Sequence, residues 1–207
     1  MTLALDLRVV ELLCSRLCHE LVNPVGAVNN GVELIEEMGA DMADEALKLI
    51  AHSAQQAQGR LKVLRLAYGA AGTELSSFGE IRTNIEKYLA GSKIGLDWPS
   101  GAVDDALASR RGTAKVLLNL LIMGEAALAY GGTLALSSGN GAVTVSARGR
   151  GASLKPDIRE ALDGGCTPAD LKPTTVHAYA TGRFAEAYGL TVTPVEAPER
   201  LDLVLRP

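Results

Sequence analysis

Residues 14–35 read CSRLCHELVNPVGAVNNGVELI, and this stretch decides the fold expected for the chain. Apolar side chains recur through it at steps of three and four residues, with one step of seven across Pro24. That spacing is typical of a helix that packs on neighbouring helices in a bundle. The stripe consists of Val10, Cys14, Leu17, Leu21, Val28, Val32 and Ile35. We therefore predict one long helix from about residue 4 to residue 38, ended by Gly39.

His19 falls on the opposite side of this helix. At about 100° per residue it lies half a turn from the apolar stripe, and it is predicted to face solvent. Pro24 has no N–H to donate to the Glu20 carbonyl, and a proline inside a helix lowers the stability of that helix by about 3 kcal/mol. A local rule broken this close to an exposed histidine indicates a functional site. The other residues on this side are Arg16, Asn23, Gly26 and Asn30.

A second helix is predicted from a cap at Asp41 to residue 68, and its apolar positions form a heptad seam. The seam comprises Leu47, Ile50, Ala54, Ala57, Leu61, Leu64 and Tyr68. Two long helices joined by a short turn pack antiparallel, with Ala54 and Ala57 expected near Pro24. We expect residues 1–71 to be a helical hairpin that forms a dimeric four-helix bundle. A monomer whose hairpin packs on its own C-terminal domain is the alternative.

The rest of the chain predicts a second domain, an α/β sandwich over residues 75–207, which gives an α+β protein. A linker at 70–77 precedes it, Ser77 and Glu80 form a capping-box signal, and Gly139-Asn140-Gly141 predicts a hairpin turn. Helices are expected over 78–89, 113–130, 156–162 and 175–188, and strands over 93–98, 133–138, 142–148, 191–195 and 201–205.

Composition excludes several classes of protein. The formal net charge is −4, so no basic surface argues for nucleic-acid binding. No run approaches the ~18 apolar residues of a membrane span, and the N-terminus lacks the basic region of a signal peptide. Three cysteines form no disulfide framework, and we expect Cys14, Cys18 and Cys166 to be structural thiols. These features predict a cytoplasmic protein.

The string HELVNP at residues 19–24 resembles the H-box of sensor histidine kinases. The longer string SRLCHELVNPVGAVNNG at 15–31 resembles the ChpT-type histidine phosphotransferases, which are kinase-shaped dimers that relay phosphate between receiver domains without ATP. The resemblance implies a homodimer that takes phosphate from the receiver domain of a hybrid histidine kinase and passes it to response regulators.

The same resemblance gives the site residues their roles. His19 is the expected phosphoacceptor, Glu20 orients the imidazole or accepts its proton, and Asn23 contacts the phosphoryl group or a water. No cofactor or metal of its own is expected, because the partner receiver domain supplies Mg²⁺. His52 and His177 are expected to be surface or packing residues. Partner docking is expected around Arg16, Val22, Gly26 and Asn30.

The second domain resembles the ATP-binding domain of histidine kinases, with its ligand-binding residues changed. The kinase helix carries two asparagines four residues apart, whereas this chain has Asn119 and then Met123, a poor partner for a hard cation. The adenine-binding aspartate is replaced by Ala147, although Gly149 and Gly151 remain. Only Gly182 remains of the second glycine-rich box. We therefore expect a scaffold that does not use ATP.

Three functions remain open at this point. The first is the phosphorelay intermediate, which is an enzyme without autokinase activity. The second is a kinase-like enzyme that binds ATP, and the third is a non-catalytic dimerisation and docking module. Arg148 and Arg150 also leave an anion site in the second domain open.

Overall fold

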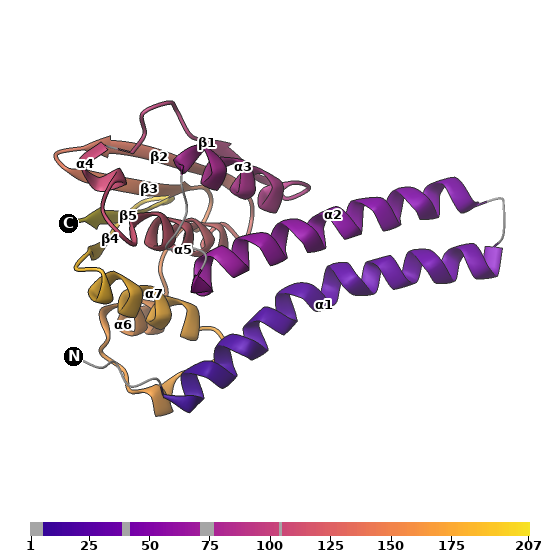
Figure 1. The fold of residues 1–207 in the computed structure, drawn as a ribbon, viewed down its shortest axis with the longest axis horizontal. Coiled ribbons are helices and arrows are strands. Elements are labelled where there is room, and N and C mark those ends of the chain that lie inside the picture. Colours follow the sequence, from indigo (N-terminus) through magenta and orange to yellow (C-terminus); the bar gives the residue numbers. More distant parts are fainter. Residues whose placement is uncertain (1–5, 39–41, 71–76, 104) are drawn as a thin grey trace.

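The computed structural model describes residues 6–38, 42–70, 77–103 and 105–207. Helices α1 (Leu7–Met38) and α2 (Ala43–Tyr68) run antiparallel and project as a hairpin beyond the rest of the chain (Figure 1). The predicted caps at Gly39 and Asp41 and the linker residues 71–76 lie outside the described residues. No helix within the described ranges is long and apolar enough to cross a membrane.

The two hairpin helices pack closely at Gly31. A Cβ atom built there would lie 2.5 Å from Ile50 Cγ1 and 3.3 Å from the Ala46 carbonyl oxygen, so only glycine permits this spacing. The predicted contact surface was partly wrong, because Ala54 is exposed while Ser53 is buried. The predicted apolar stripes are wider than the surface between the two helices. Part of each stripe faces the other helix of the hairpin, and part of it is exposed.

The remaining elements alternate helices and strands as predicted. The helices are α3 (Phe78–Leu89), α4 (Asp105–Ala108), α5 (Thr113–Ala126), α6 (Pro156–Asp163), η3 (Pro168–Asp170) and α7 (Val176–Ala187). The strands are β1 (Ile94–Asp97), β2 (Gly132–Gly139), β3 (Ala142–Arg148), β4 (Thr191–Ala197) and β5 (Arg200–Arg206). Ser77 caps α3 by accepting a hydrogen bond from the Glu80 amide.

Two differences from the prediction are local. The helix expected over 113–130 ends at Ala126, because the chain must turn through Gly131, at φ 87°, to enter β2. The short helices α4 and η3 were not predicted, since three or four residues carry no periodic pattern.

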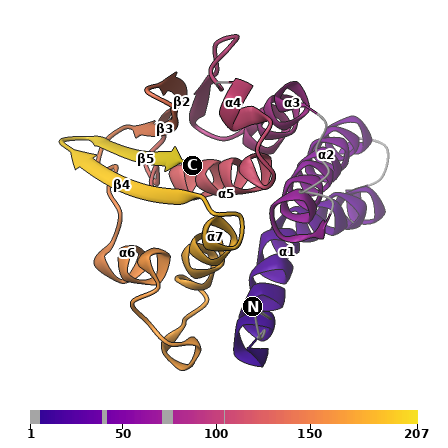
Figure 2. The ribbon, with the colours of Figure 1, turned by 60° about the vertical axis from the view of Figure 1, so that its left-hand side comes forward.

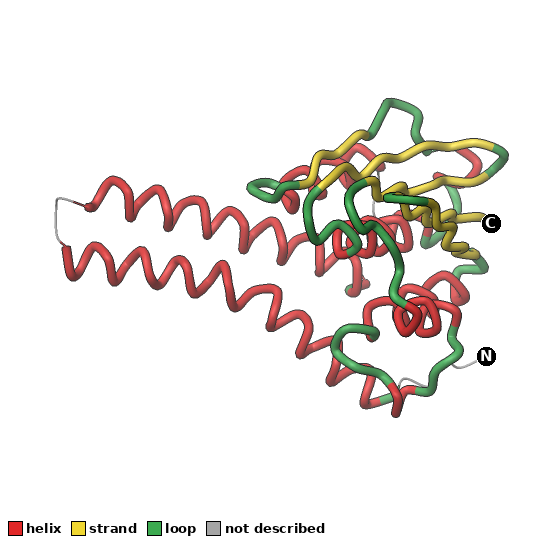
Figure 3. Tube along the Cα trace, turned by 180° about the vertical axis from the view of Figure 1, so that it is seen from behind, coloured by secondary structure: helices red, strands yellow, loops and turns green. Residues whose placement is uncertain are grey.

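The strands, yellow in Figure 3, form one mixed sheet. Its order is β1-β2-β3-β5-β4. β1 pairs parallel with β2, and the remaining neighbours are antiparallel. The predicted β2–β3 turn is confirmed: Asn140 and Gly141 both have positive φ, at 52° and 69°, as a two-residue hairpin turn of type I′ requires.

Helix α5 forms the centre of the core, between the sheet and the hairpin (Figure 2). Nearly every residue from Thr113 to Gly124 is buried, which explains why its sequence is apolar all round. The base of the hairpin belongs to the same core through Val9, Leu12, Val63, Leu66 and Ala67. The α+β architecture is therefore confirmed, and its two predicted parts share one apolar core.

Candidate functional site

His19 is exposed on α1 and lines a cavity of about 300 Å³ between the two hairpin helices. Among the described residues, no side chain forms a hydrogen bond with the His19 ring. Both imidazole nitrogens are therefore open to an incoming molecule. We call this space the His19 cavity; it is lined by His19, Glu20, Asn23, Pro24 and Ala27 of α1 and by Gln56 and Arg60 of α2.

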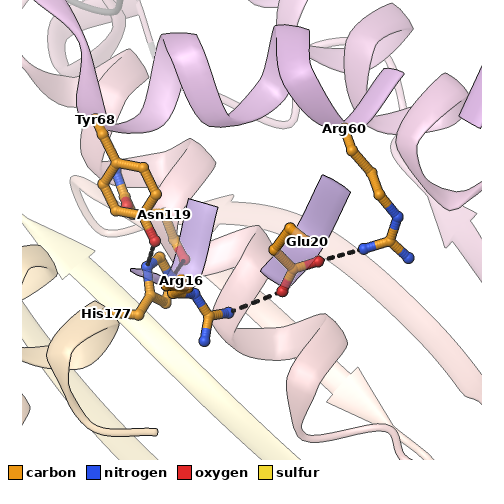
Figure 4. Close-up of polar contacts among 6 residues, drawn as sticks. All are labelled: Arg16, Glu20, Arg60, Tyr68, Asn119 and His177. Carbon is orange, nitrogen blue, oxygen red and sulfur yellow. Dashed lines mark hydrogen bonds and ion pairs between the residues drawn. The ribbon is translucent and has the colours of Figure 1, made fainter. Parts of the chain in front are cut away.

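The Glu20 carboxylate lies between two arginines. Its Oε2 accepts a hydrogen bond from Arg60 Nη1, and its Oε1 lies 3.7 Å from Arg16 Nη2 (Figure 4). Side chains at adjacent helix positions point about 100° apart, so a direct contact with His19 is not the default geometry. The predicted role of Glu20 toward the imidazole stays a prediction.

The structure corrects the placement of Arg16. It was expected on the exposed face beside His19, but its side chain is only 18% exposed and lies over Tyr68 and His177 (Figure 4). Its Nε is buried without a hydrogen-bond partner. The side chain lines a cavity together with His177 and Ala178 of α7, while one end of its guanidinium group lies near the Glu20 carboxylate.

The other predicted docking residues do share the solvent side of α1. Val22 is 62% exposed, Asn23 and Asn30 are exposed, and a Cβ at Gly26 would meet no atom within 4 Å. Gly26 therefore leaves an open surface close to His19, with room for an approaching protein. Whether a partner docks on this surface stays a prediction.

Sequence reasoning missed the contribution of α2 to the site. Arg60 and Gln56 come from the second helix, and neither belongs to the apolar seam by which that helix was recognised. Residues equally distant from the turn of an antiparallel hairpin face each other. Counting outward from residue 40 would have paired position 20 with position 60, which is the Glu20–Arg60 contact observed.

A second polar cluster joins the base of the hairpin to the sheet domain. The Tyr68 hydroxyl lies 2.6 Å from His177 Nδ1, and His177 Nε2 lies 3.2 Å from the Asn119 carbonyl oxygen. His177 is buried, and burial lowers its pKa to about 3, helped by the charge of Arg16. Burial likewise raises the pKa of Tyr68 to about 12. The packing role predicted for His177 is what these contacts show.

The region around Asn119, Met123 and Ala147, which the resemblance matches to the kinase nucleotide site, contains little open space. The Asn119 amide donates to the Ala67 and Lys115 carbonyl oxygens, so it ties α5 to the end of α2. Ala147 is 1% exposed, inside the core. The cavity next to Met123 measures about 170 Å³, below the ~300–1,000 Å³ of typical ligand sites. Arg16 forms part of its wall.

The cysteines and acidic residues add no metal centre in the part of the chain that the structure describes. No group of three or more His, Cys, Asp or Glu side chains there is placed to hold a metal ion. Cys14 and Cys18 are free and exposed, so the single chain does not bury these two predicted structural thiols. Helical spacing places them on the side of α1 that carries the exposed Val25 and Val32.

Comparison with known proteins shows the family. Residues 78–200 match the family described as "Histidine phosphotransferase C-terminal domain". Protein phosphotransferase ChpT of Brucella abortus (strain 2308) is 34% identical over 196 residues, which are 92% of this chain and 90% of that protein. The chain belongs to the ChpT-type histidine phosphotransferase family, as its H-box region predicted.

Solved structures agree with this assignment. One described as a bacterial phosphotransferase aligns with a TM-score of 0.78 and 29% identity, over 100% of this chain and 98% of that chain. The fold of this chain is therefore shared over nearly the whole length of that chain.

Proposed function

We propose that this protein is a histidine phosphotransferase of a multistep phosphorelay. His19 accepts a phosphoryl group from the aspartate of a receiver domain in a hybrid histidine kinase and passes it to response regulators in the cytoplasm. The observation that carries the proposal is an exposed imidazole that has no hydrogen-bond partner among the described residues, in a cavity that is also lined by Asn23, Gln56 and Arg60. Family membership supports the reaction class.

The transfer step needs only an available nitrogen and compensation of charge. His19 Nε2 attacks phosphorus, the N–P bond forms, and the P–O bond to the aspartate breaks with its electron pair returning to the carboxylate. The imidazole gains positive charge, and its Nδ1–H proton is donated to Glu20 or to water. Asn23 donates a hydrogen bond to the phosphoryl group. The receiver domain brings the Mg²⁺ that neutralises the phosphoryl oxygens.

Labelling from a receiver domain tests this proposal. A receiver domain phosphorylated with ³²P should transfer label to the protein, and mass spectrometry should locate it on His19. The His19→Gln variant should lose the label and keep its melting temperature, because this side chain is exposed and contributes little packing. Labelling that persists in His19→Gln, or label found on His52, would contradict the assignment.

ATP is not part of the proposed reaction. The 170 Å³ cavity beside Met123 is too small for a nucleotide, and the Asn119 amide is already engaged. A fluorescent nucleotide titration should show no saturable binding at micromolar protein. Saturable, magnesium-dependent binding would favour the kinase-like alternative instead.

We also propose that the protein is a homodimer with a four-helix bundle. The hairpin leaves large apolar side chains uncovered on one face: Val25 is 56% exposed, Val32 42%, Leu47 55% and Leu61 54%. A second copy of the hairpin would cover them and Cys18. Sedimentation equilibrium of the parent protein should give twice the chain mass of 21.6 kDa. The Leu61→Lys variant should give the mass of a single chain. A monomeric parent protein would contradict the dimer.

A further inference from the structure

Arg60 stands out because it lies in the His19 cavity and was assigned no role by the phosphotransfer motif. Its Nη1 donates to Glu20, and within the described ranges its other N–H groups have no hydrogen-bond partner. A guanidinium group offers five N–H donors in a planar fork that matches phosphate geometry. Arg60 therefore has unused donors, and it lines the same cavity as His19.

The rest of the Arg60 side chain is held near that space without being fixed. Its guanidinium carbon lies 5.3 Å from the centre of the Tyr88 ring, within the range of a cation–π contact. The side chain is 31% exposed, so the terminal group has room to turn. Tyr88 is buried in the core of the sheet domain, and it provides a fixed aromatic surface next to the guanidinium group.

Glu20 would keep a partner if Arg60 left it. Its side chain is 22% exposed, and removing the only partner of a half-buried carboxylate is costly. Arg16 supplies the second positive charge, and its side chain is only 18% exposed, next to Tyr68 and His177. Two arginines on one carboxylate are explained if one is structural and the other changes partner during the reaction.

We propose that Arg60 is the phosphoryl-binding residue of the site and that it moves from Glu20 to the phosphoryl group when phosphate arrives. This inference rests on the phosphotransferase function proposed above and deepens it. A phosphoryl group with nearly two negative charges attracts the guanidinium more strongly than one carboxylate does. The move also frees one Glu20 oxygen to accept a hydrogen bond from the His19 Nδ1–H, so arrival of phosphate prepares the acceptor.

Substitution at Arg60 tests the phosphoryl contact. Arg60→Gln should slow transfer from a phosphorylated receiver domain to His19 by about 10- to 100-fold, the size of one charge-assisted hydrogen bond. Arg60→Lys should fall between, because lysine keeps the charge and loses the fork. The matched control is Arg65→Gln, an exposed arginine on α2 outside the His19 cavity, which should transfer at the parent rate. A parent rate in Arg60→Gln would overturn the proposal.

The change of partner has its own readout that does not need a receiver domain. Potassium phosphoramidate would phosphorylate His19 chemically, in a His52→Gln background. In the unmodified protein, melting temperatures of Glu20→Gln, Arg60→Gln and the double variant should reveal coupling between the two residues. In the phosphorylated protein this coupling should fall toward zero. Unchanged coupling would overturn the change of partner, whereas a receiver domain that never labels His19 would overturn only the proposed function.

Discussion

His19 and His177 have the same side chain but lie in opposite surroundings. His19 is exposed, and among the described residues nothing bonds its ring, whereas His177 is 4% exposed with both nitrogens within hydrogen-bond distance of Tyr68 and Asn119. An imidazole with free nitrogens is available for chemistry, and one with both nitrogens engaged can only hold the structure together. Reactivity in this protein is therefore decided by the contacts of each histidine.

The largest expected effect is a difference in stability between alanine variants of the two histidines. His177→Ala should lower the free energy of unfolding by about 3 kcal/mol, since it opens a cavity and leaves the Tyr68 hydroxyl and the Asn119 carbonyl oxygen without partners. His19→Ala should change it by less than about 0.5 kcal/mol. Urea unfolding of both variants measures this. Equal losses would remove the contrast.

Acid should destabilise the folded protein through the buried His177. The folded pKa of His177, about 3, lies below the ordinary value of 6.5, so between these values the unfolded chain binds a proton that the folded chain does not. Stability from this group is complete above pH 6.5 and falls as the pH drops, by about 2 kcal/mol from pH 6.5 to 5. Urea unfolding at several pH values should show this slope, flattened in His177→Gln. An identical slope in both proteins would contradict the assignment.

A similar contrast between filled and open surroundings holds for two glycines of α1. Gly31→Ala should destabilise the hairpin by about 1–2 kcal/mol, because its Cβ would overlap Ile50. Gly26→Ala should instead stabilise the helix by about 0.5–1 kcal/mol, since nothing lies within 4 Å and alanine favours helix. Thermal unfolding followed by circular dichroism compares the pair. Destabilisation by Gly26→Ala would show that its surroundings are filled.

The smallest expected effect isolates one hydrogen bond. Tyr68→Phe removes the hydroxyl beside His177 Nδ1 and should cost about 1 kcal/mol. Transfer to His19 should be unchanged, because Tyr68 does not line the His19 cavity. Urea unfolding and receiver-domain labelling of the same preparation measure both. A loss of transfer without a loss of stability would show that the cluster at His177 communicates with the site.

Sequence patterns predicted the elements well where local chemistry decides them. The helix over Phe78–Leu89 begins at its capping serine, and the β2–β3 turn follows from Asn140 and Gly141. The exposure of His19 followed from helical periodicity alone. Sequence patterns did not predict the positions of two long side chains that can reach more than one neighbour. Arg16 is largely buried, and Arg60 of α2 contacts Glu20 in the site.

The sequence by itself determined the helical hairpin, the exposed histidine and the presence of Met123 and Ala147 where kinases carry nucleotide-binding residues, because periodicity and residue type fix these over short distances. The tertiary structure decided which charges meet at Glu20, which histidine is buried and how Gly31 sets the spacing of the hairpin. Those outcomes depend on residues separated by 40 positions for Glu20 and Arg60, by 109 for Tyr68 and His177, and by the whole turn of the hairpin for Gly31 and Ile50, and only folding brings such residues within contact distance.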